Sequence, residues 1–177
     1  MTLTPQTRPI TVSELDIVRD LAMQIWPKSY RASVPPDQID SLVSQTFDLD
    51  RLEDEIMQRG HVYFVIRVGR VDVGFCSAHL EGTRIWITKL CVMADFRGFG
   101  LGKALIHAAQ DYFAPAEDVV MCIHKDHDPA VNFCLRSGFK IAREIPSDLG
   151  DLTDYVMHKP MPHAQNTAQN TAQMCAA

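Results

Sequence analysis

A glycine-rich segment near the middle of the chain constrains the fold more than any other feature. Residues 97–102 read Arg-Gly-Phe-Gly-Leu-Gly and lie between an apolar, strand-like run at 85–93 and an amphipathic helical pattern at 101–113. Because Gly98, Gly100 and Gly102 lack a Cβ, backbone N–H groups can approach a ligand closely, and the following helix N-terminus favours negative charge. The segment therefore predicts a strand-to-helix corner that binds an anion such as a diphosphate.

The glycine spacing excludes two well-known phosphate-binding corners. A dinucleotide-binding fold needs Gly-x-Gly-x-x-Gly, whereas this chain has Gly-x-Gly-x-Gly. A P-loop needs a glycine where Arg97 stands and a hydroxyl side chain where Ala104 follows Lys103. We therefore expect neither of these nucleotide sites.

Length and composition limit the architecture and the partners. The 177 residues, 46% of them apolar, suffice for one packed core, so we expect a single domain at 1–162 and a low-complexity tail at 163–177. A net charge of −5 argues against a nucleic-acid partner, and no apolar run reaches the ~18 residues of a membrane span. Without an apolar N-terminal signal, the chain is predicted to be cytoplasmic.

Cysteine and histidine spacing gives no indication of a metal site. The five cysteines are scattered and never occur as Cys-x-x-Cys, and the seven histidines lack His-x-x-x-His spacing. We therefore predict no metal centre. The cysteines are interpreted as small, buried apolar residues.

Helical periodicity dominates before residue 60. Ser13 is expected to cap a first helix, with Asp16 completing the cap, and Pro27 is expected to stop it. A second helix is expected after the Pro35-Pro36 start signal. Asp48 is expected to cap a further short helix.

Strand periodicity begins at residue 61. Three antiparallel strands are expected before the glycine corner, and a short apolar run after the corner helix predicts a strand parallel to the last of them. One more helix and two closing strands follow. In order, these segments are 62–68, 71–80, 84–93, 119–123, the helix 128–136, a strand from Phe139 and the strand 153–159.

Two motifs resemble signatures of the GNAT family of N-acetyltransferases. The first is Arg/Gln-x-x-Gly-x-Gly/Ala, satisfied by Arg97, Gly100 and Gly102, and the family's corner binds the diphosphate of coenzyme A. The second is Ala130 to Phe139, which is similar to a family signature that ends in Gly-Phe. The resemblance implies an α/β (α+β) fold, with a mixed sheet of about six to seven strands, two of them parallel and splayed, and about four to five helices.

The resemblance also implies acetyl-CoA as the co-substrate. The pantetheine would pair with the backbone of the first splayed strand, the corner amides would hold the diphosphate, and the second signature would flank the sulfur end. The residues assigned in this way are Leu90, Cys91, Val92, Arg97, Gly98, Phe99, Gly100, Leu101, Gly102, Lys103, Asn132 and Phe133.

Two departures from the family pattern concern the catalytic groups. Many relatives have a Tyr acid where this chain has Cys134, and a Glu where it has Trp86. Cys134 is therefore the candidate catalytic residue, because a thiol can protonate a thiolate; its other interpretation is an inert core residue. Substitute bases are sought among His79, His124 and His127, and His127 also stands where relatives often carry an Asn that contacts the coenzyme.

Further similarities suggest the acceptor. Runs such as Trp26–Tyr30 and Asp154–Met157 resemble bacterial polyamine (spermidine/spermine) N-acetyltransferases. Residues 37–55 carry seven acidic side chains against one basic and are expected either to line an amine cleft or to form a solvated surface. We predict direct acetyl transfer to a small cationic amine such as a polyamine. A non-catalytic acetyl-CoA-binding module and a protein N-terminal or lysine acetyltransferase remain alternatives, and a homodimer is compatible with the resemblance.

Overall fold

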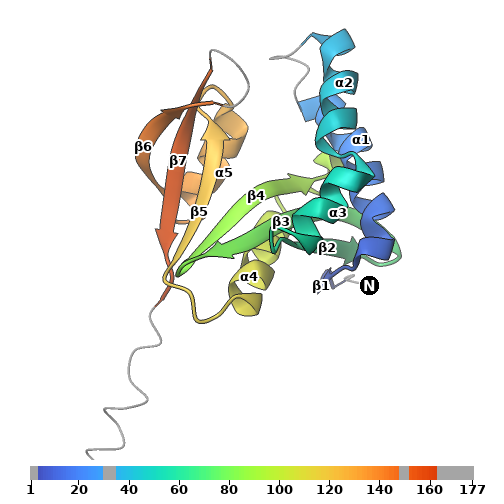
Figure 1. Ribbon diagram of the computed structural model, residues 1–177. Helices are drawn as coiled ribbons and strands as arrows, with labels where there is room; N and C mark the ends of the chain where they lie inside the picture. The colour runs from blue at the N-terminus through green and yellow to red at the C-terminus, as the bar shows by residue number, and fades with distance from the viewer. Residues whose placement is uncertain (1–3, 30–34, 148–151, 163–177) are drawn as a thin grey trace, which may run out of the picture.

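The computed structural model describes residues 4–29, 35–147 and 152–162 (Figure 1). The expected tail at 163–177 lies outside the described residues. The helices of the described chain are α1 (Leu15–Ser29), α2 (Pro36–Thr46), α3 (Leu49–Met57), α4 (Leu101–Tyr112) and α5 (Asp128–Arg136), with short 3₁₀ turns at Val12–Glu14 and Ala94–Phe96. The strands are β1 (Gln6–Pro9), β2 (Val62–Val68), β3 (Val71–Glu81), β4 (Arg84–Val92), β5 (Asp118–His124), β6 (Lys140–Pro146) and β7 (Thr153–Pro160).

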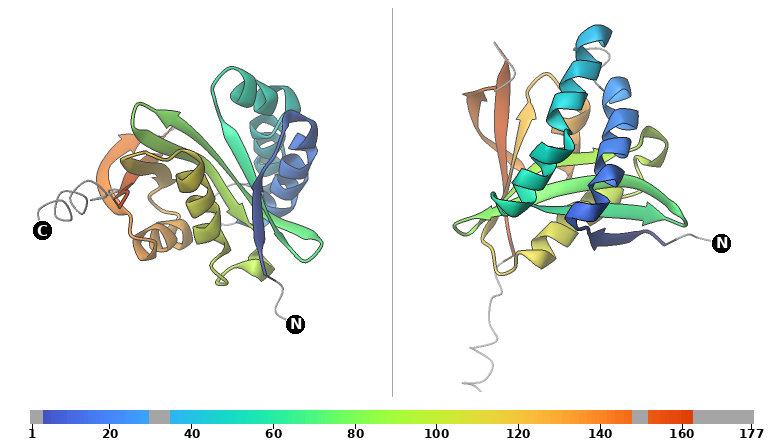
Figure 2. Two further views of the ribbon diagram at one scale, coloured as in Figure 1. Left: turned by 90° about the horizontal axis from the view of Figure 1, so that it is seen from below. Right: turned by 45° about the vertical axis from the view of Figure 1, so that its right-hand side comes forward.

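All seven strands form one mixed sheet in the order β1-β2-β3-β4-β5-β7-β6. The β4–β5 pair is parallel and every other pair is antiparallel. Helices α1, α2 and α3 cover one face of the sheet, and α4 and α5 lie on the other (Figure 2). The sequence-based expectation of a mixed α/β sheet with two parallel strands is confirmed.

Two apolar cores lie on the two faces of the sheet because the central strands are apolar on both sides. Along β2, Tyr63 and Val65 pack with α1, α2 and α3, while Phe64 and Ile66 pack with α4. Alternate side chains of a strand point to opposite faces, so a strand covered on both faces reads as a continuous apolar run. The helices are thereby fixed against the strands that form the site.

The first helix differs from its expected ends. A 3₁₀ turn, Val12–Glu14, precedes α1, and Thr11, not Ser13, begins its capping box: the Glu14 carboxylate accepts a hydrogen bond from the Thr11 backbone N–H (3.2 Å). The longer Glu side chain can reach back across the turn, as a capping box requires. Pro27 lies inside α1, which continues to Ser29. So close to the helix end, a missing N–H removes one hydrogen bond without breaking the helix.

The expected cap of α3 is confirmed. The Asp48 carboxylate accepts a hydrogen bond from the Arg51 backbone N–H, as an N-cap side chain should. Strand β2 and helix α5 have the predicted bounds, and the other strands differ at their ends. Within the described parts of the chain, no helix combines the length and apolar character needed to cross a bilayer.

Candidate active site

The parallel strands β4 and β5 pair over only four residues each and then separate. Their register joins Arg84–Ile87 to Asp118–Met121, after which both strands continue without pairing to one another. Separation begins at Thr88, the extra residue of a β-bulge, because Ser77 pairs with Lys89 and Ala78 with Ile87. A bulge bends its strand and increases the local twist, which accounts for the splay.

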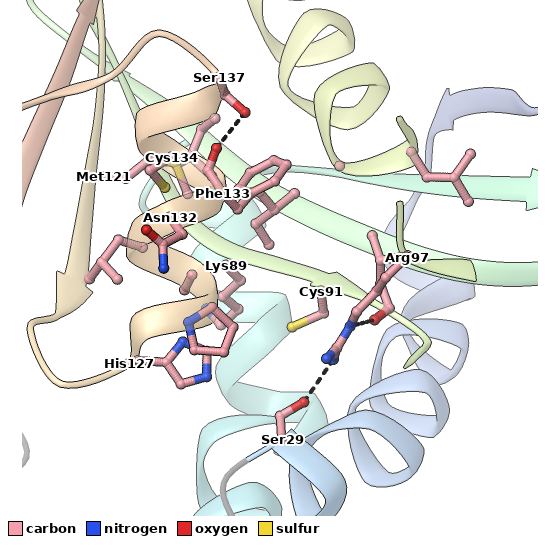
Figure 3. A pocket seen from close by; sticks show the side chains of 18 of the residues that line it. Ser29, Lys89, Cys91, Arg97, Met121, His127, Asn132, Phe133, Cys134 and Ser137 are labelled. Carbon is pink, nitrogen blue, oxygen red and sulfur yellow. Dashed lines mark hydrogen bonds between the residues drawn. The ribbon is translucent and has the colours of Figure 1, made fainter. Parts of the chain in front are cut away.

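A cavity of about 710 Å³ opens at the splay (Figure 3). Its lining comes from α1, the second half of β4, the glycine corner, the end of β5 and α5. Of the residues assigned to the cofactor from sequence, all but Phe99 line it, and Phe99 is 76% exposed. The tertiary structure therefore brings together two motifs separated by about thirty residues of chain.

The glycine corner has the backbone conformation that its sequence predicts. Gly98 (φ 85°) and Gly100 (φ 79°) are left-handed, and Gly100 is the N-cap of α4. Because Gly100 has no side chain, the N-cap residue offers no acceptor to the N–H groups of the first turn. An uncapped helix start beside two left-handed glycines can receive an anion through backbone N–H groups.

Arg97 connects the corner to two other elements. Its Nε donates to the Val92 carbonyl oxygen (3.0 Å) and its Nη2 to the Ser29 hydroxyl at the end of α1 (2.9 Å; Figure 3). The guanidinium lies at the cavity wall. Arg97 thus holds the end of α1 beside the part of β4 that has no β5 partner, and it adds positive charge near the corner.

Helix α5 approaches the corner through Phe133. A Cβ added to Gly102 would come within 2.9 Å of the Phe133 ring, so the third glycine of the motif allows the close packing of α5 against α4. Asn132, one residue earlier, is exposed on the cavity side of α5 (Figure 3). The two signatures therefore meet in one wall of the cavity.

The thiols of the cavity differ in burial. Cys134 is 1% exposed in the core beneath α4, and burial raises its pKa to about 11. Burial likewise raises the pKa of Cys91 to about 11. Both thiols are therefore protonated at neutral pH and can donate a proton but not act as bases. Cys122 is exposed, which corrects the expectation that the cysteines are buried.

The three histidines considered as bases lie in different places. His124 and His127 line the cavity, whereas His79 lies outside its lining on β3. Burial, followed by the charge of Arg97, lowers the pKa of His127, so this imidazole is neutral at physiological pH. Among the described residues, no three His, Cys, Asp or Glu side chains are grouped to hold a metal ion.

A buried polar cluster, which sequence analysis did not predict, lies where α3 meets the sheet. Glu55 on α3 is 5% exposed, and both its oxygens accept hydrogen bonds from Lys89 Nζ on β4 (2.8 and 2.6 Å). The Tyr63 hydroxyl also donates to Glu55. Burial alone would raise the pKa of Glu55, but Lys89 and Tyr63 hold it below its usual value. A lysine within an apolar strand, and a glutamate three residues after buried Leu52, were the available signals.

His61 extends this cluster along β2 and β3. Its Nδ1 lies 2.9 Å from the Ser77 hydroxyl and 3.6 Å from Glu55, and its ring stacks on His79 at 4.4 Å. Burial is the main reason that the pKa of His61 falls to about 4, so the folded protein holds it neutral.

This shift predicts loss of stability in acid. Because the folded-state pKa lies below the ordinary 6.5, the contribution of His61 is complete above pH 6.5 and is lost as the pH falls toward 4. We expect the free energy of unfolding, measured by urea denaturation, to fall across this range. In His61→Gln the fall should be shallower, whereas His107→Gln, at an exposed position on α4, should leave it unchanged. Equal slopes in His61→Gln and wild type would contradict the prediction.

The acidic segment 37–55 contributes differently from the expected cleft. No residue of 37–55 lines the cavity where the structure describes it. Asp40, Asp50 and Glu53 are exposed, Asp54 pairs with Arg59, and Glu55 is turned into the sheet. The solvated-surface interpretation therefore fits most of this segment.

An α/β domain with splayed parallel strands and an uncapped, glycine-lined helix start opening on one cavity has the architecture of an acyl-coenzyme-dependent transferase. The model of the Acetyltransferase (GNAT) family matches residues 16–139. The chain belongs to this family: it is an N-acetyltransferase, and acetyl-CoA is its co-substrate.

Solved structures share the fold at low sequence identity. The PaiA N-acetyltransferase of Thermoplasma acidophilum in complex with coenzyme A has a TM-score of 0.77 at 16% identity, covering 90% of this chain and 100% of that one. The Escherichia coli ribosomal-protein-S18-alanine N-acetyltransferase has a TM-score of 0.67 at 13% identity, covering 92% and 99%. A chimera of the Vibrio cholerae spermidine N-acetyltransferase SpeG and hSSAT has 0.65 at 14%, covering 88% and 95%. A comparison with curated proteins gave no significant sequence match.

Proposed function

We propose that the protein transfers the acetyl group of acetyl-CoA to the primary amine of a small molecule by direct attack in a ternary complex. One observation carries the proposal: the α4 start at Gly100, the edge of β4 that has no β5 partner and the second-signature helix α5 all open on the same cavity. This arrangement has room for a diphosphate at one end and a thioester at the other.

The proposed coenzyme placement follows the elements of the cavity. Backbone N–H groups of residues 97–103 hold the diphosphate, with charge added by Arg97 and Lys103. The pantetheine pairs with the β4 edge from Leu90 to Val92, which has no β5 partner. Asn132 and Phe133 of α5 lie beside the sulfur end.

The chemistry needs a neutral amine, a donor for the oxyanion and a proton for the departing thiolate. A backbone N–H of Cys91 or Val92 is the proposed oxyanion donor, because this part of β4 faces the splay. The Cys134 thiol, protonated at neutral pH, is the proposed donor to the departing thiolate, and the proton that the attacking nitrogen loses restores the thiol. No Asp or Glu lines the described part of the cavity, so proton removal from the amine has no carboxylate base there.

The identity of the acceptor is also proposed. A polyamine is the acceptor that the sequence resemblance suggests, and the spermidine N-acetyltransferase chimera is among the similar folds. None of the described cavity side chains is acidic, so the described lining does not favour a polycation over other small primary amines. A cytoplasmic location and a homodimer belong to the same proposal.

A thiol-release assay with acetyl-CoA tests the proposal. The acceptor panel contains spermidine, an aminoglycoside, amino-acid amides and short peptides, with tertiary-amine analogues as matched controls because they cannot form a neutral amide. We expect release of coenzyme A with at least one small primary amine and background hydrolysis with its tertiary analogue. Acetyl-CoA binding without turnover on the whole panel would overturn the proposed transfer, and turnover with peptides alone would favour the protein acetyltransferase.

A further inference from the structure

Lys89 places a fixed ammonium at the wall of the cavity where β4 begins to splay. Its side chain is 10% exposed and lines the cavity one residue after the bulge at Thr88 (Figure 3). Its Nζ lies between the two oxygens of Glu55 and 5.6 Å from the centre of the Tyr63 ring. Neither Glu55 nor Tyr63 belongs to the cavity lining.

Of the Lys89–Glu55 pair, only Lys89 belongs to the cavity lining, so the cation of the pair is the member nearer to the cavity. Both oxygens of Glu55 accept hydrogen bonds from the Lys89 ammonium and keep it in place. Arg51 of α3 lies 3.8 Å from Glu55 with its side chain 56% exposed, and His61, which directly precedes β2, is neutral. His79 of β3, stacked on His61, also has a lowered pKa, chiefly through burial.

The remaining charges of the lining are also positive. Arg97, Lys103 and Arg136 are its other lysine and arginine residues, and no carboxylate accompanies them among the described lining residues. A coenzyme diphosphate at the corner would neutralise Arg97 and Lys103. Lys89 lies on β4 beside the splay instead, so its charge acts on whatever approaches the thioester.

A described lining that carries lysine and arginine side chains but no carboxylate discriminates between the two protonation states of an amine. An alkylammonium entering the cavity would be repelled by Lys89 and would lose its hydration without gaining an anionic partner. A neutral –NH₂ pays neither cost. An α-amino group has a pKa of about 7.7–8.0 against about 10.4 for a lysine-like alkylamine, so at neutral pH far more of it is neutral.

We propose that the acceptor is a weakly basic amine of the α-amino type, bound as the free amine, and that Lys89 held by Glu55 excludes alkylammonium ions. This inference rests on the proposed function and names its acceptor class. The amine nitrogen forms the C–N bond with the acyl carbon and the C–S bond breaks. The proton lost by the attacking nitrogen ends on the coenzyme thiolate, so amine and acetyl-CoA give amide and coenzyme A without any further reactant.

Size-matched acceptor pairs test the acceptor class with wild-type enzyme. Glycinamide is compared with propylamine, and phenylalaninamide with phenethylamine, at pH about 7. We expect kcat/KM to favour the amide of each pair by about 200- to 400-fold, the ratio of the free-amine fractions at pH 7. Equal use of both members, or a preference for the alkylamine or spermidine, would overturn the inference while leaving the acetyl transfer intact. No turnover with any amine would overturn the proposed function and this inference together.

Variants test the role of Lys89 separately. The double variant Lys89→Met/Glu55→Gln removes both charges, so neither is left unpaired. Propylamine should inhibit glycinamide acetylation about tenfold more strongly in this variant than in wild type, because the propylammonium ion is no longer repelled by the Lys89 ammonium. Arg51→Met is the matched control, because it removes a cation beside the same carboxylate but outside the cavity, and inhibition should stay unchanged. Unchanged inhibition in the double variant would refute the exclusion by Lys89. If that variant does not fold, the acceptor preference of the wild type still tests the acceptor class.

Discussion

Gly100→Glu is expected to abolish acetyl-CoA binding, with at least ~100-fold weaker affinity by isothermal calorimetry. The residue is the left-handed N-cap of α4 at the cavity wall. A carboxylate here would occupy the positive end of the helix and repel the diphosphate. Each charge-assisted hydrogen bond lost in this way weakens the affinity for acetyl-CoA several-fold. Acetyl transfer should be lost with binding.

Gly82→Glu separates the loss of the site from the strain of the substitution. Gly82 is also left-handed (φ 61° against 79° for Gly100), and an added Cβ at either position has open space within 4 Å. Gly82 lies in the β3–β4 turn, outside the cavity lining. The Gly82→Glu variant should therefore lose as much stability from backbone strain as Gly100→Glu and still bind acetyl-CoA normally. Tight binding by Gly100→Glu would refute the assignment of the corner to the coenzyme diphosphate.

Gly74→Ala is expected to destabilise the fold by about 3 kcal/mol, the upper range for overpacking a rigid interior. A Cβ here would lie 2.6 Å from the Cys91 carbonyl oxygen, with Val92 and Ile66 also closer than ordinary contact distance. The nearest atom belongs to the backbone of β4, so it cannot move without disturbing the strand that faces the splay. Denaturant unfolding measures the loss, and acetyl transfer should decrease in parallel.

Gly60→Ala serves as the comparison for Gly74→Ala. Its added Cβ meets nothing within 4 Å, and its cost is the left-handed backbone alone, about 1–2 kcal/mol. Activity should survive in Gly60→Ala once the protein is folded, because Gly60 lies outside the cavity lining. A Gly74→Ala protein as stable as wild type would mean that β3 and β4 are not packed as closely as the structure indicates.

The acid–base arrangement follows from the groups that the fold buries. The thiols of Cys91 and Cys134 have raised pKa values, and the His127 imidazole is neutral. A cavity of this kind can return a proton to a thiolate but has little capacity to remove one from a strongly basic amine. The proposed preference for a weakly basic acceptor therefore has the same origin as the absence of the Tyr and Glu found in many relatives: the described cavity lining lacks a strong base.

Local sequence determined the elements whose signals lie within a few residues of one another. The corner conformation of Gly98 and Gly100 and the cap at Asp48 follow from conformational freedom and side-chain reach. The parallel pairing of β4 and β5 followed from an apolar run placed after a helix. These signals are read from neighbouring residues without knowledge of distant contacts. The two sequence motifs that meet at the cavity were found in the same way.

Only the tertiary structure decided which polar side chains face one another. Glu55 and Lys89 are separated by thirty-three residues, and their pairing depends on how α3 packs on the sheet and on the bulge at Thr88. The same packing turned Glu55 away from the acidic surface to which its sequence neighbours belong. Periodicity reports whether a position is buried, but the partner of a buried charge is set by the register and docking of separate elements. The place of Lys89 in the cavity lining, held by Glu55, was therefore not predictable from the sequence alone.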